Sequence, residues 1–309
     1  MPRRRPVAWP RWGHAAAQLA VALCALLGLA AQASGPIEVR DDAGRVVRLA
    51  QAPQRVVSLL PSLTESVCVL GACERLVATD RYSNWPHAVL ALPKVGGGLD
   101  PNIEAVVAAR PDLVLLASST RAADRLRALG LTVLALEPNT QADAQRVLRT
   151  LGQALGLPEA AARDQWARIE QGVAQARARL LPAARGLRVY VEVSSTPHGA
   201  GEASFIGQLL KDLGAHNILP ASMGPFPVVN PEHVVQARPQ VVLVGDSSQA
   251  LMRARPGWSD LPAMQAPRLC ALSPAQADVL MRPGPRMAEA AQLVVDCLNR
   301  SVTLPGRAP

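Results

Sequence analysis

The sequence predicts an α/β protein of two parallel-sheet lobes, related by internal duplication and joined by one long rigid helix, with a ligand cleft between the lobes. Short β-branched runs alternate with helix-forming segments, which is the pattern of parallel sheets. Residues 102–116 (NIEAVVAARPDLVLL) and 230–244 (NPEHVVQARPQVVLV) are identical at nine of fifteen positions, at an offset of 128. The segment between the two halves lacks the Gly/Ser content of a flexible linker.

Each copy of the repeat predicts a helix, a tight turn and a buried strand. Helix-entry residues come first, an apolar-periodic turn or two follows, and Arg-Pro ends the helix before a β-branched run. Further strands are expected at residues 55–60, 131–136 and 188–193. The strands at 55–60 and 188–193 each precede a Ser/Thr/Pro loop and another helix, so the two halves share one order of elements.

Pro158 suits the first position of a helix that runs without interruption to Pro182. A helix of about 24 residues is roughly 36 Å long, comparable to a lobe. The predicted organisation is therefore an N-terminal lobe over 34–157, an interlobe helix over 158–184 and a C-terminal lobe over 185–309. A rigid connection disfavours large hinge closure and favours a largely pre-formed cleft.

Composition argues against nucleic-acid binding. Nine aromatic residues among 309 offer few stacking platforms for single strands. The formal net charge is +8, but residues 1–33 hold four Arg and no acid, so the remainder is close to balanced.

The first 33 residues are expected to be a cleaved signal peptide. Arg3, Arg4 and Arg5 precede an apolar stretch over 15–31, and Ala31-Gln32-Ala33 offers a small-x-small cleavage site. A membrane anchor is the alternative, as is a lipoprotein at Cys24, where Leu23 fits poorly. A cleaved leader predicts a periplasmic protein.

Export permits disulfides among the remaining cysteines. Cys68 and Cys73 flank Gly71, and a local bridge is possible there if the chain reverses. Cys270 and Cys297 either form a second bridge or are small buried residues. No metal-ligand spacing accompanies them, so no metal site is expected.

Ligands of open parallel sheets bind beyond the carboxyl ends of the strands, so the loops there hold the candidate residues. The loop after residues 55–60 contains Ser62, and the next loop, Asp80–Pro86, contains Tyr82 and Trp85. Stacking on a ligand is one role for these rings, and Trp85 could instead fold back as a lid on the core. The glycines at 96–98 lack a phosphate-binding frame and predict a tight loop.

In the second half, Phe226 lies between prolines ahead of the repeated helix, and Asp278 and Arg282 lie in a segment rich in Pro and Gly before the last helix. The two charged residues are candidates for ligand contact; the alternative is a helix-capping acid and a surface arginine. The sequence contains no G-x-S-x-G or H-E-x-x-H motif, and no enzymatic activity is expected.

Glu104 and Glu232 occupy equivalent positions in the two repeats, each in a first helical turn. The helix dipole alone favours acids there. Two carboxylates related by pseudo-two-fold symmetry would equally match a symmetric partner with two basic pockets.

These features resemble the periplasmic binding proteins of cobalamin and iron-siderophore ABC importers, from about Pro53 to Asn299. The specific segments are RVVSLLPSLTE (55–65), YSNWP (82–86), the two N-x-E…A-R-P repeats and RPGPR (282–286). The resemblance implies two α/β lobes joined rigidly by one helix. The YSNWP segment is most similar to the cobalamin-binding branch.

By this resemblance, the ligand-binding residues are Tyr82, Trp85, Phe226, Asp278 and Arg282. Ser62 and His198 are also expected to contact the ligand. The resemblance further implies that Glu104 and Glu232 dock on the transporter. The chain departs from the cobalamin binder at Gly97 or Gly98, Ser118 and His198, where that protein supplies aromatic residues.

The expected function is capture of cobalamin or a related corrinoid as transported ligand, without a resident cofactor. The loaded protein, expected to be a monomer, would dock on a dimeric permease in the inner membrane. The alternatives are a ferric siderophore or haem as the ligand, and an exported enzyme acting on a corrinoid or tetrapyrrole.

Overall fold

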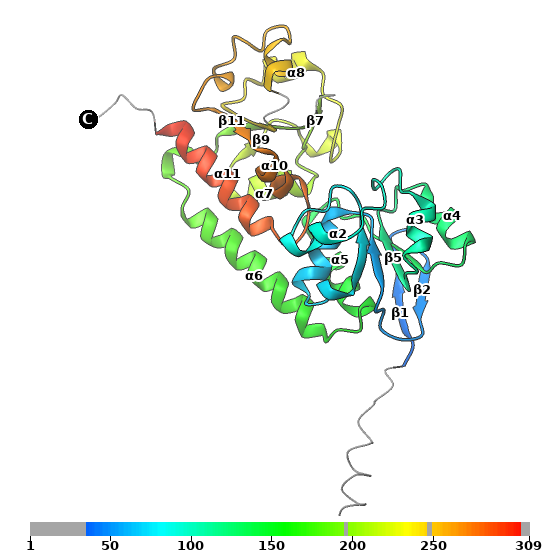
Figure 1. The fold of residues 1–309 in the computed structure, drawn as a ribbon. Helices are drawn as coiled ribbons and strands as arrows, with labels where there is room; N and C mark the ends of the chain where they lie inside the picture. The colour runs from blue at the N-terminus through cyan, green and yellow to red at the C-terminus, as the bar shows by residue number, and fades with distance from the viewer. Residues whose placement is uncertain (1–34, 195–196, 246–248, 304–309) are drawn as a thin grey trace, which may run out of the picture.

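The computed structural model describes residues 35–194, 197–245 and 249–303, and it consists of two α/β lobes connected by a long helix (Figure 1). The expected signal peptide, residues 1–33, lies outside the described residues. Within the described part of the chain, no helix has both the length and the apolar character needed to cross a bilayer.

The N-terminal lobe is built on a four-stranded, all-parallel sheet in the order β4-β3-β5-β6. The sequence did not lead us to expect the antiparallel hairpin that precedes this sheet. The strands are β1 (Ile37–Arg40), β2 (Val46–Leu49), β3 (Val56–Ser58), β4 (Leu76–Thr79), β5 (Leu113–Leu116) and β6 (Val133–Ala135). The helices are α2 (Pro61–Val69), α3 (Ile103–Ala108), α4 (Ala122–Ala128) and α5 (Gln141–Ala154), with short 3-10 turns at Cys73–Arg75 and His87–Ala91.

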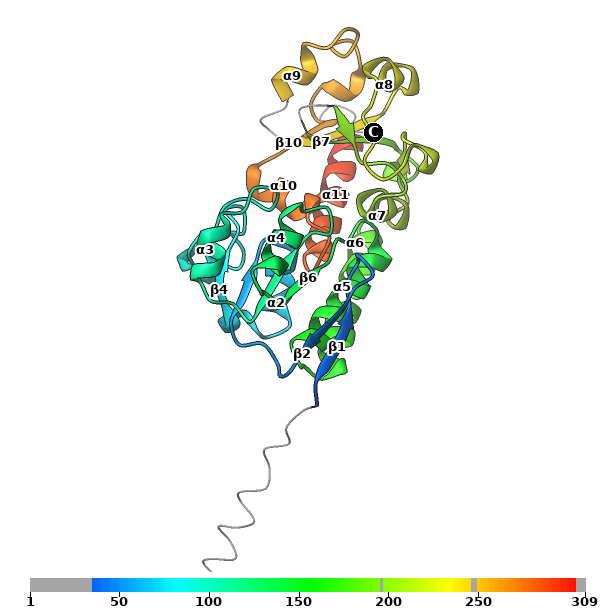
Figure 2. The same cartoon turned by 90° about the vertical axis from the view of Figure 1, so that its right-hand side faces the viewer.

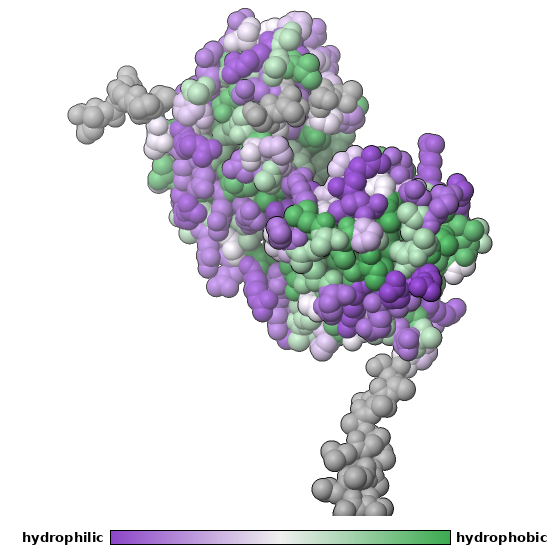
Figure 3. All heavy atoms as spheres, viewed as in Figure 1, coloured by the Kyte–Doolittle hydropathy of each residue, from purple (hydrophilic) through white to green (hydrophobic). Residues whose placement is uncertain are grey.

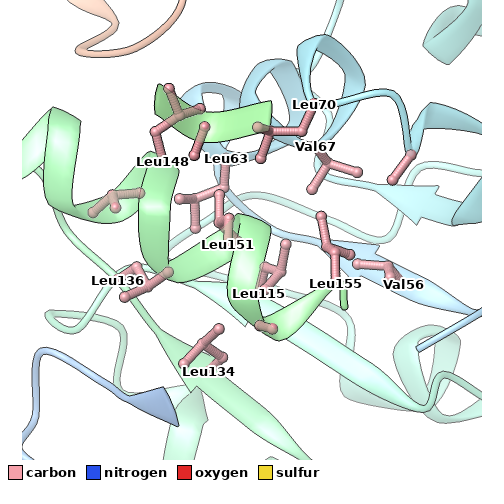
Figure 4. Packing of buried hydrophobic residues seen from close by; sticks show 14 of the residues in the cluster. Val56, Leu63, Val67, Leu70, Leu115, Leu134, Leu136, Leu148, Leu151 and Leu155 are labelled. Atoms are coloured by element: carbon pink, nitrogen blue, oxygen red, sulfur yellow. The ribbon is translucent and has the colours of Figure 1, made fainter. Parts of the chain in front are cut away.

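Both faces of this sheet are buried, as the uninterrupted apolar runs of its strands require. Leu113 and Leu115 face α2 and α5, where Leu63 and Leu151 complete one core (Figure 4). Val114 and the other alternate residues face α3 and α4 and form a second core.

The C-terminal lobe repeats this topology. β10 lies between β11 and β7, and β9 pairs with the other edge of β7, all in parallel. One strand, β8, is antiparallel to the end of β7 and has no counterpart in the first lobe. The strands are β7 (Arg188–Ser194), β8 (His198–Gly199), β9 (His216–Asn217), β10 (Val241–Gly245) and β11 (Leu269–Leu272). The helices are α7 (Phe205–Leu213), α8 (Pro231–Ala237), α9 (Gln249–Arg253), α10 (Pro274–Met281) and α11 (Met287–Val302), with 3-10 turns at Pro182–Ala184, Ala221–Met223 and Pro262–Met264.

The duplication extends to side-chain contacts. Asn102 and Asn230 cap α3 and α8, each accepting a hydrogen bond from a backbone N–H of the first turn. Beyond each helix end, an arginine at the start of the neighbouring strand donates to the exposed carbonyls: Arg55 to Ala109 and Arg110, and Arg188 to Arg238. The same arginine contact therefore closes the repeated helix in both lobes.

The interlobe helix is α6 (Glu159–Ala178), which passes along both lobes (Figures 1 and 2). Its first half contributes Trp166 and Ile169 to a core of the N-terminal lobe, and Ala176 belongs to a core of the C-terminal lobe. α11 packs against it closely, because a Cβ on Gly172 would lie only 2.5 Å from the Cβ of Ala288. One helix is thus held by both lobes.

The expected extent of this helix, 158–184, is too long. Pro158 is the N-cap, the helix ends at Ala178, and Pro182 begins a separate 3-10 turn. Leu181 has extended backbone angles because the ring of a following proline disfavours the helical conformation.

Two disulfides lie within single lobes. Cys68 pairs with Cys73 across Gly71, which has φ +87°, so the chain reverses there and the Cα atoms approach to 4.0 Å. Cys270 on β11 pairs with Cys297 on α11. Of the two alternatives for the second pair, the structure has the bridge.

Candidate functional site

The loops at the carboxyl ends of β3, β4 and β5 surround a small, mainly apolar pocket of about 250 Å³ on the N-terminal lobe. It is lined by Leu59, Leu60, Pro61, Tyr82, Gly98, Leu99, Asp100, Ala117 and Thr120. The space-filling view shows a recess where the two lobes meet (Figure 3). The pocket is at the sheet edge where parallel α/β folds bind ligands.

The glycine loop is a wall of this pocket. A Cβ on Gly98 would lie 2.7 Å from the carbonyl oxygen of Leu59, so only glycine lets the two backbones approach this closely. Thr120 Oγ1 donates to the Gly98 carbonyl at 3.1 Å and fixes the loop from the β5 side. The tight loop predicted at 96–98 therefore has a packing reason.

Tyr82 is the most accessible ring at the pocket, with 59% of its surface exposed. The fully buried carboxylate of Asp80 accepts hydrogen bonds from the backbone N–H groups of Tyr82 and Ser83. Lys94 Nζ donates to the Ser83 carbonyl at 2.7 Å, and burial lowers the pKa of this lysine despite the nearby Asp80. The backbone that presents Tyr82 is thus anchored from below.

Trp85 and Phe226 have different surroundings from Tyr82. The guanidinium carbon of Arg286 lies 5.2 Å from the Trp85 ring centroid, and the tryptophan is half-buried. Phe226 packs on Phe205, with ring centroids 6.1 Å apart. Among the described residues, no ring-to-ring contact joins the three aromatic side chains, so they do not form one aromatic cluster.

Arg282 is buried, not a surface residue. Its side chain is 9% exposed and bonds to Glu65 (2.8 Å), Asn84 Oδ1 (2.8 Å), the Tyr82 carbonyl (3.0 Å) and Asp278 (2.8 Å). This corrects the surface-arginine alternative. The ligand contact expected of Arg282 stays a prediction; in this structure protein groups engage both of its terminal nitrogens.

Asp278 lies inside α10 rather than at its N-terminus, so the capping alternative is wrong. Its carboxylate forms an ion pair with Arg282 at 2.8 Å and accepts a hydrogen bond from the Asn84 side-chain amide at 2.7 Å. One third of the side chain stays accessible, so a ligand contact by Asp278 remains compatible with the structure.

Sequence analysis did not identify Glu65 as important. This carboxylate is 1% exposed and accepts from Arg282 and from Arg286, the latter through Nε and Nη2 at 3.0 and 2.7 Å. The sequence offers little signal for this role, because Glu65 lies between the polar residues Thr64 and Ser66 of α2; its need for charged partners follows from its burial.

Two other predicted ligand residues lie apart from the pocket lining. Ser62 is 4% exposed, with its carbonyl accepting from the Ser66 hydroxyl at 2.7 Å, so the structure does not support the expected ligand contact. His198 lies on β8 in the C-terminal lobe, half-buried, with Nδ1 3.3 Å from Ser194 Oγ. Ser118 donates to Glu137 at 2.7 Å.

Glu104 and Glu232 both lie in the first turn of their helices and both are exposed. Glu104 has one distant ionic neighbour, Arg125 at 3.9 Å. The two carboxylates thus have the equivalent, solvent-facing placement that the repeat predicts.

Three arginines near the N-terminal lobe's sheet edge are paired with acids, whereas Arg121, next to the pocket-lining Thr120, is exposed. Arg81 bonds Asp100 at 2.7 Å, and Arg282 and Arg286 share Glu65. Within 35–194, 197–245 and 249–303, no group of three or more His, Cys, Asp or Glu side chains is arranged to hold a metal ion.

Comparisons with known proteins agree with this architecture. The family model described as "Periplasmic binding protein" matches residues 56–275. The vitamin B12-binding protein of Yersinia pestis (strain Pestoides F) is 31% identical over 248 residues, which cover 79% of this chain and 85% of the relative.

Solved structures are similar over most of their length. The periplasmic vitamin B12 binding protein BtuF of Vibrio cholerae superposes with a TM-score of 0.64 and 26% identity, covering 82% of this chain and 99% of that one. The periplasmic heme-binding protein RhuT from Roseiflexus sp. RS-1 has a TM-score of 0.69 and 25% identity, with 80% and 98% covered. Members of this family are substrate-binding transport proteins, not enzymes. The family match over most of the chain and the duplicated two-lobe fold together establish that this chain belongs to the periplasmic binding protein family of ABC transporters.

Proposed function

We propose that the protein captures cobalamin or a related corrinoid in the periplasm and delivers it to a dimeric inner-membrane permease. The observation on which this depends is the apolar pocket lined by Tyr82, together with the pairing of Arg81, Arg282 and Arg286 with acids. A corrin ring is large and mainly apolar, with a periphery of neutral amides. It needs apolar surface and a few hydrogen-bonding groups rather than a basic cleft.

The charges around the pocket favour a corrinoid over a ferric siderophore. Many ferric siderophore complexes are anions and would need basic side chains that are not already paired with acids. Here Arg81 faces Asp100, and the charges of Arg282 and Arg286 are balanced by Glu65 and Asp278. The partly accessible Asp278 and the half-buried Glu137 add acceptors that suit amide donors and repel carboxylates.

Haem is the second candidate, and one observation favours it. Tyr82 is exposed at the pocket, and a tyrosine phenolate is an established type of axial haem ligand. The similarity to a heme-binding neighbour supports the same possibility. Haem propionates, however, are anionic, and the charges of Arg81, Arg282 and Arg286 are already neutralised by acids.

The docking part of the proposal uses Glu104 and Glu232. Their equivalent placement on α3 and α8 supports contact with a two-fold symmetric permease that offers one basic pocket to each lobe. One monomer carries both carboxylates, so no second copy of the chain is required.

Calorimetric titration tests the proposal. We expect cyanocobalamin to bind with a Kd of about 1 μM or tighter, equivalent to about 8 kcal/mol. Dicyanocobinamide, haemin and a ferric hydroxamate are titrated in parallel. Absence of heat and of thermal shift with both corrinoids would refute the corrinoid assignment. Haemin binding that produces a Soret shift, lost in Tyr82→Phe, would favour haem instead.

A further inference from the structure

Four charged side chains form a cluster where the lobes meet, and we name Glu65, Asp278, Arg282 and Arg286 the interlobe charge cluster. Asp278 is partly accessible, and the other three side chains are at most 10% exposed. Glu65 belongs to α2 of the N-terminal lobe, and the other three lie on α10 and its connection to α11. Figures 1 and 2 place this connection against the N-terminal lobe. Two carboxylates and two guanidinium groups balance, so the cluster has no net charge.

The cluster also reaches the 82–85 loop, which carries the pocket-lining Tyr82 and the neighbouring Trp85. Arg282 Nη2 donates to the Tyr82 carbonyl at 3.0 Å and Nη1 to Asn84 Oδ1 at 2.8 Å. Asp278 accepts from the other end of the same Asn84 amide at 2.7 Å. The Arg286 guanidinium lies over the Trp85 ring.

We propose that Arg282 is a positioning residue: seated on Glu65, it fixes the 82–85 loop from the opposite lobe and thereby sets where Tyr82 and Trp85 face the ligand. The loop belongs covalently to the N-terminal lobe, yet these contacts to its outer part come from the C-terminal lobe. Its position therefore depends on how the lobes are placed relative to each other.

The geometry favours positioning over ligand contact. Both Nη atoms of Arg282 are engaged by protein groups, and only 9% of the side chain is accessible. A planar fork satisfies several acceptors at once, which a lysine ammonium cannot do in the same arrangement. Glu65 is needed because an unpaired buried guanidinium would be costly, and it pairs with Arg282 and Arg286 together.

The inference rests on the proposed function only in treating the 82–85 loop as a wall of the ligand cleft, so its test uses ligand-free protein. Three tryptophans, Trp85, Trp166 and Trp258, lie in the described part of the chain. Incorporating 5-fluorotryptophan gives each a separate ¹⁹F resonance, which single Trp→Phe replacements assign. Hydrogen exchange of residues 82–85 is measured on the same samples.

The variants are Arg282→Lys, Arg282→Met and Glu65→Gln, with Arg127→Met as matched control. Arg127 is a largely buried arginine that pairs with Asp41 and Asp124 within the N-terminal lobe. We expect Arg282→Met to shift the Trp85 resonance and to speed exchange of the loop by about tenfold. Arg282→Lys gives a smaller change in the same direction, and Arg127→Met changes neither quantity.

A general loss of structure would instead shift the ¹⁹F resonances of Trp166 and Trp258 and speed hydrogen exchange in β5. These signals therefore report on global effects. An unchanged Trp85 resonance and unchanged loop exchange in folded Arg282→Lys and Glu65→Gln would overturn the proposal. Weaker corrinoid binding by Arg282→Lys with no change in the loop would also overturn it, in favour of direct contact. Failure of the wild-type chain to bind any corrinoid would refute the proposed function and leave the loop measurements standing.

Discussion

Arg110 and Arg238 are 128 residues apart and share a left-handed backbone conformation, each with φ of 46°. Each is followed by a proline that separates the repeated helix from the strand after it, and each directs its carbonyl to an arginine from the neighbouring strand. A non-glycine residue with positive φ is strained, so the duplicated halves have kept the same costly turn.

Replacing Arg238 by glycine is expected to stabilise the protein. Left-handed geometry costs an ordinary residue about 1–2 kcal/mol, and the extra unfolded-state entropy of glycine returns up to about 1 kcal/mol of this. Urea unfolding should therefore show a net gain of up to about 1 kcal/mol for Arg238→Gly. Arg238→Ala retains the positive φ and should give no gain; equal stabilisation by both variants would contradict the strain argument.

Tyr82 and Trp85 should differ when each is replaced by alanine. Tyr82 is mostly exposed, so Tyr82→Ala is expected to weaken cyanocobalamin binding about tenfold, or about 1.4 kcal/mol, with an unchanged Tm. Trp85 also packs under Arg286, so Trp85→Ala should lower both affinity and Tm. Calorimetry and thermal melts measure the two effects.

The control for the aromatic pair is Tyr190→Phe, which alters the buried Tyr190–Glu192 hydrogen bond in the C-terminal lobe and should change Tm alone. Loss of Tm without loss of affinity in Trp85→Ala would assign this tryptophan to the lid role.

Gly172 governs the contact between α6 and α11. Alanine at a helical glycine normally stabilises by about 1 kcal/mol. Here the new methyl would lie 2.5 Å from Ala288 Cβ. Forced separation of the helices typically costs about 1–3 kcal/mol, so Gly172→Ala should lower the free energy of unfolding despite its better helix propensity.

Ala288→Gly supplies the missing space and serves as the second arm of a double-mutant cycle. We expect the double variant to be more stable than the sum of the single effects predicts, measured by denaturant unfolding. Strict additivity would show that the two positions do not limit the approach of the helices.

Asp143 should make stability depend on acid pH. Burial raises the pKa of this carboxyl, but hydrogen bonds from Thr140 and Arg146 outweigh burial and hold the pKa below its usual value. A depressed acid pKa contributes stability that is present above the unfolded pKa of about 3.9. It is lost as pH falls through the folded-state value.

Asp143→Asn should therefore cost about 1 kcal/mol near neutral pH, typical of a capping contact at a helix start. The cost should shrink as pH falls below the unfolded pKa of about 3.9 and vanish once pH lies below the depressed folded-state pKa. Urea midpoints of both proteins across this range provide the measurement, and a cost that persists undiminished in acid would contradict the assignment.

The sequence was sufficient to predict the fold because the relevant signals are local or repeated. The N-x-E…A-R-P copies place α3 with β5 and α8 with β10, and the apolar runs from 55 and 188 are β3 and β7. The hairpin over 37–49 was missed although Ile37 and Val39 alternate with polar residues, because two four-residue strands give a weak pattern.

The site was only partly predictable. The position of Tyr82 at the pocket could be predicted because its loop follows β4, and ligands of parallel α/β sheets bind at the carboxyl ends of the strands. The role of Arg282 does not follow, because its partner Glu65 is 217 residues away in the chain and the contact arises only when the lobes meet. Charge pairing across a tertiary interface has no periodicity or spacing that a single sequence reveals.

Because α6 supplies side chains to a core in each lobe, neither lobe has a complete hydrophobic core without this helix. Loss of one lobe would expose the apolar side chains that α6 contributes to the core of that lobe. The molecule should therefore unfold as a single cooperative unit. Neither lobe should fold stably once the chain between them is cut. Ligand-facing loops, by contrast, contribute little to this shared interior and are free to diverge.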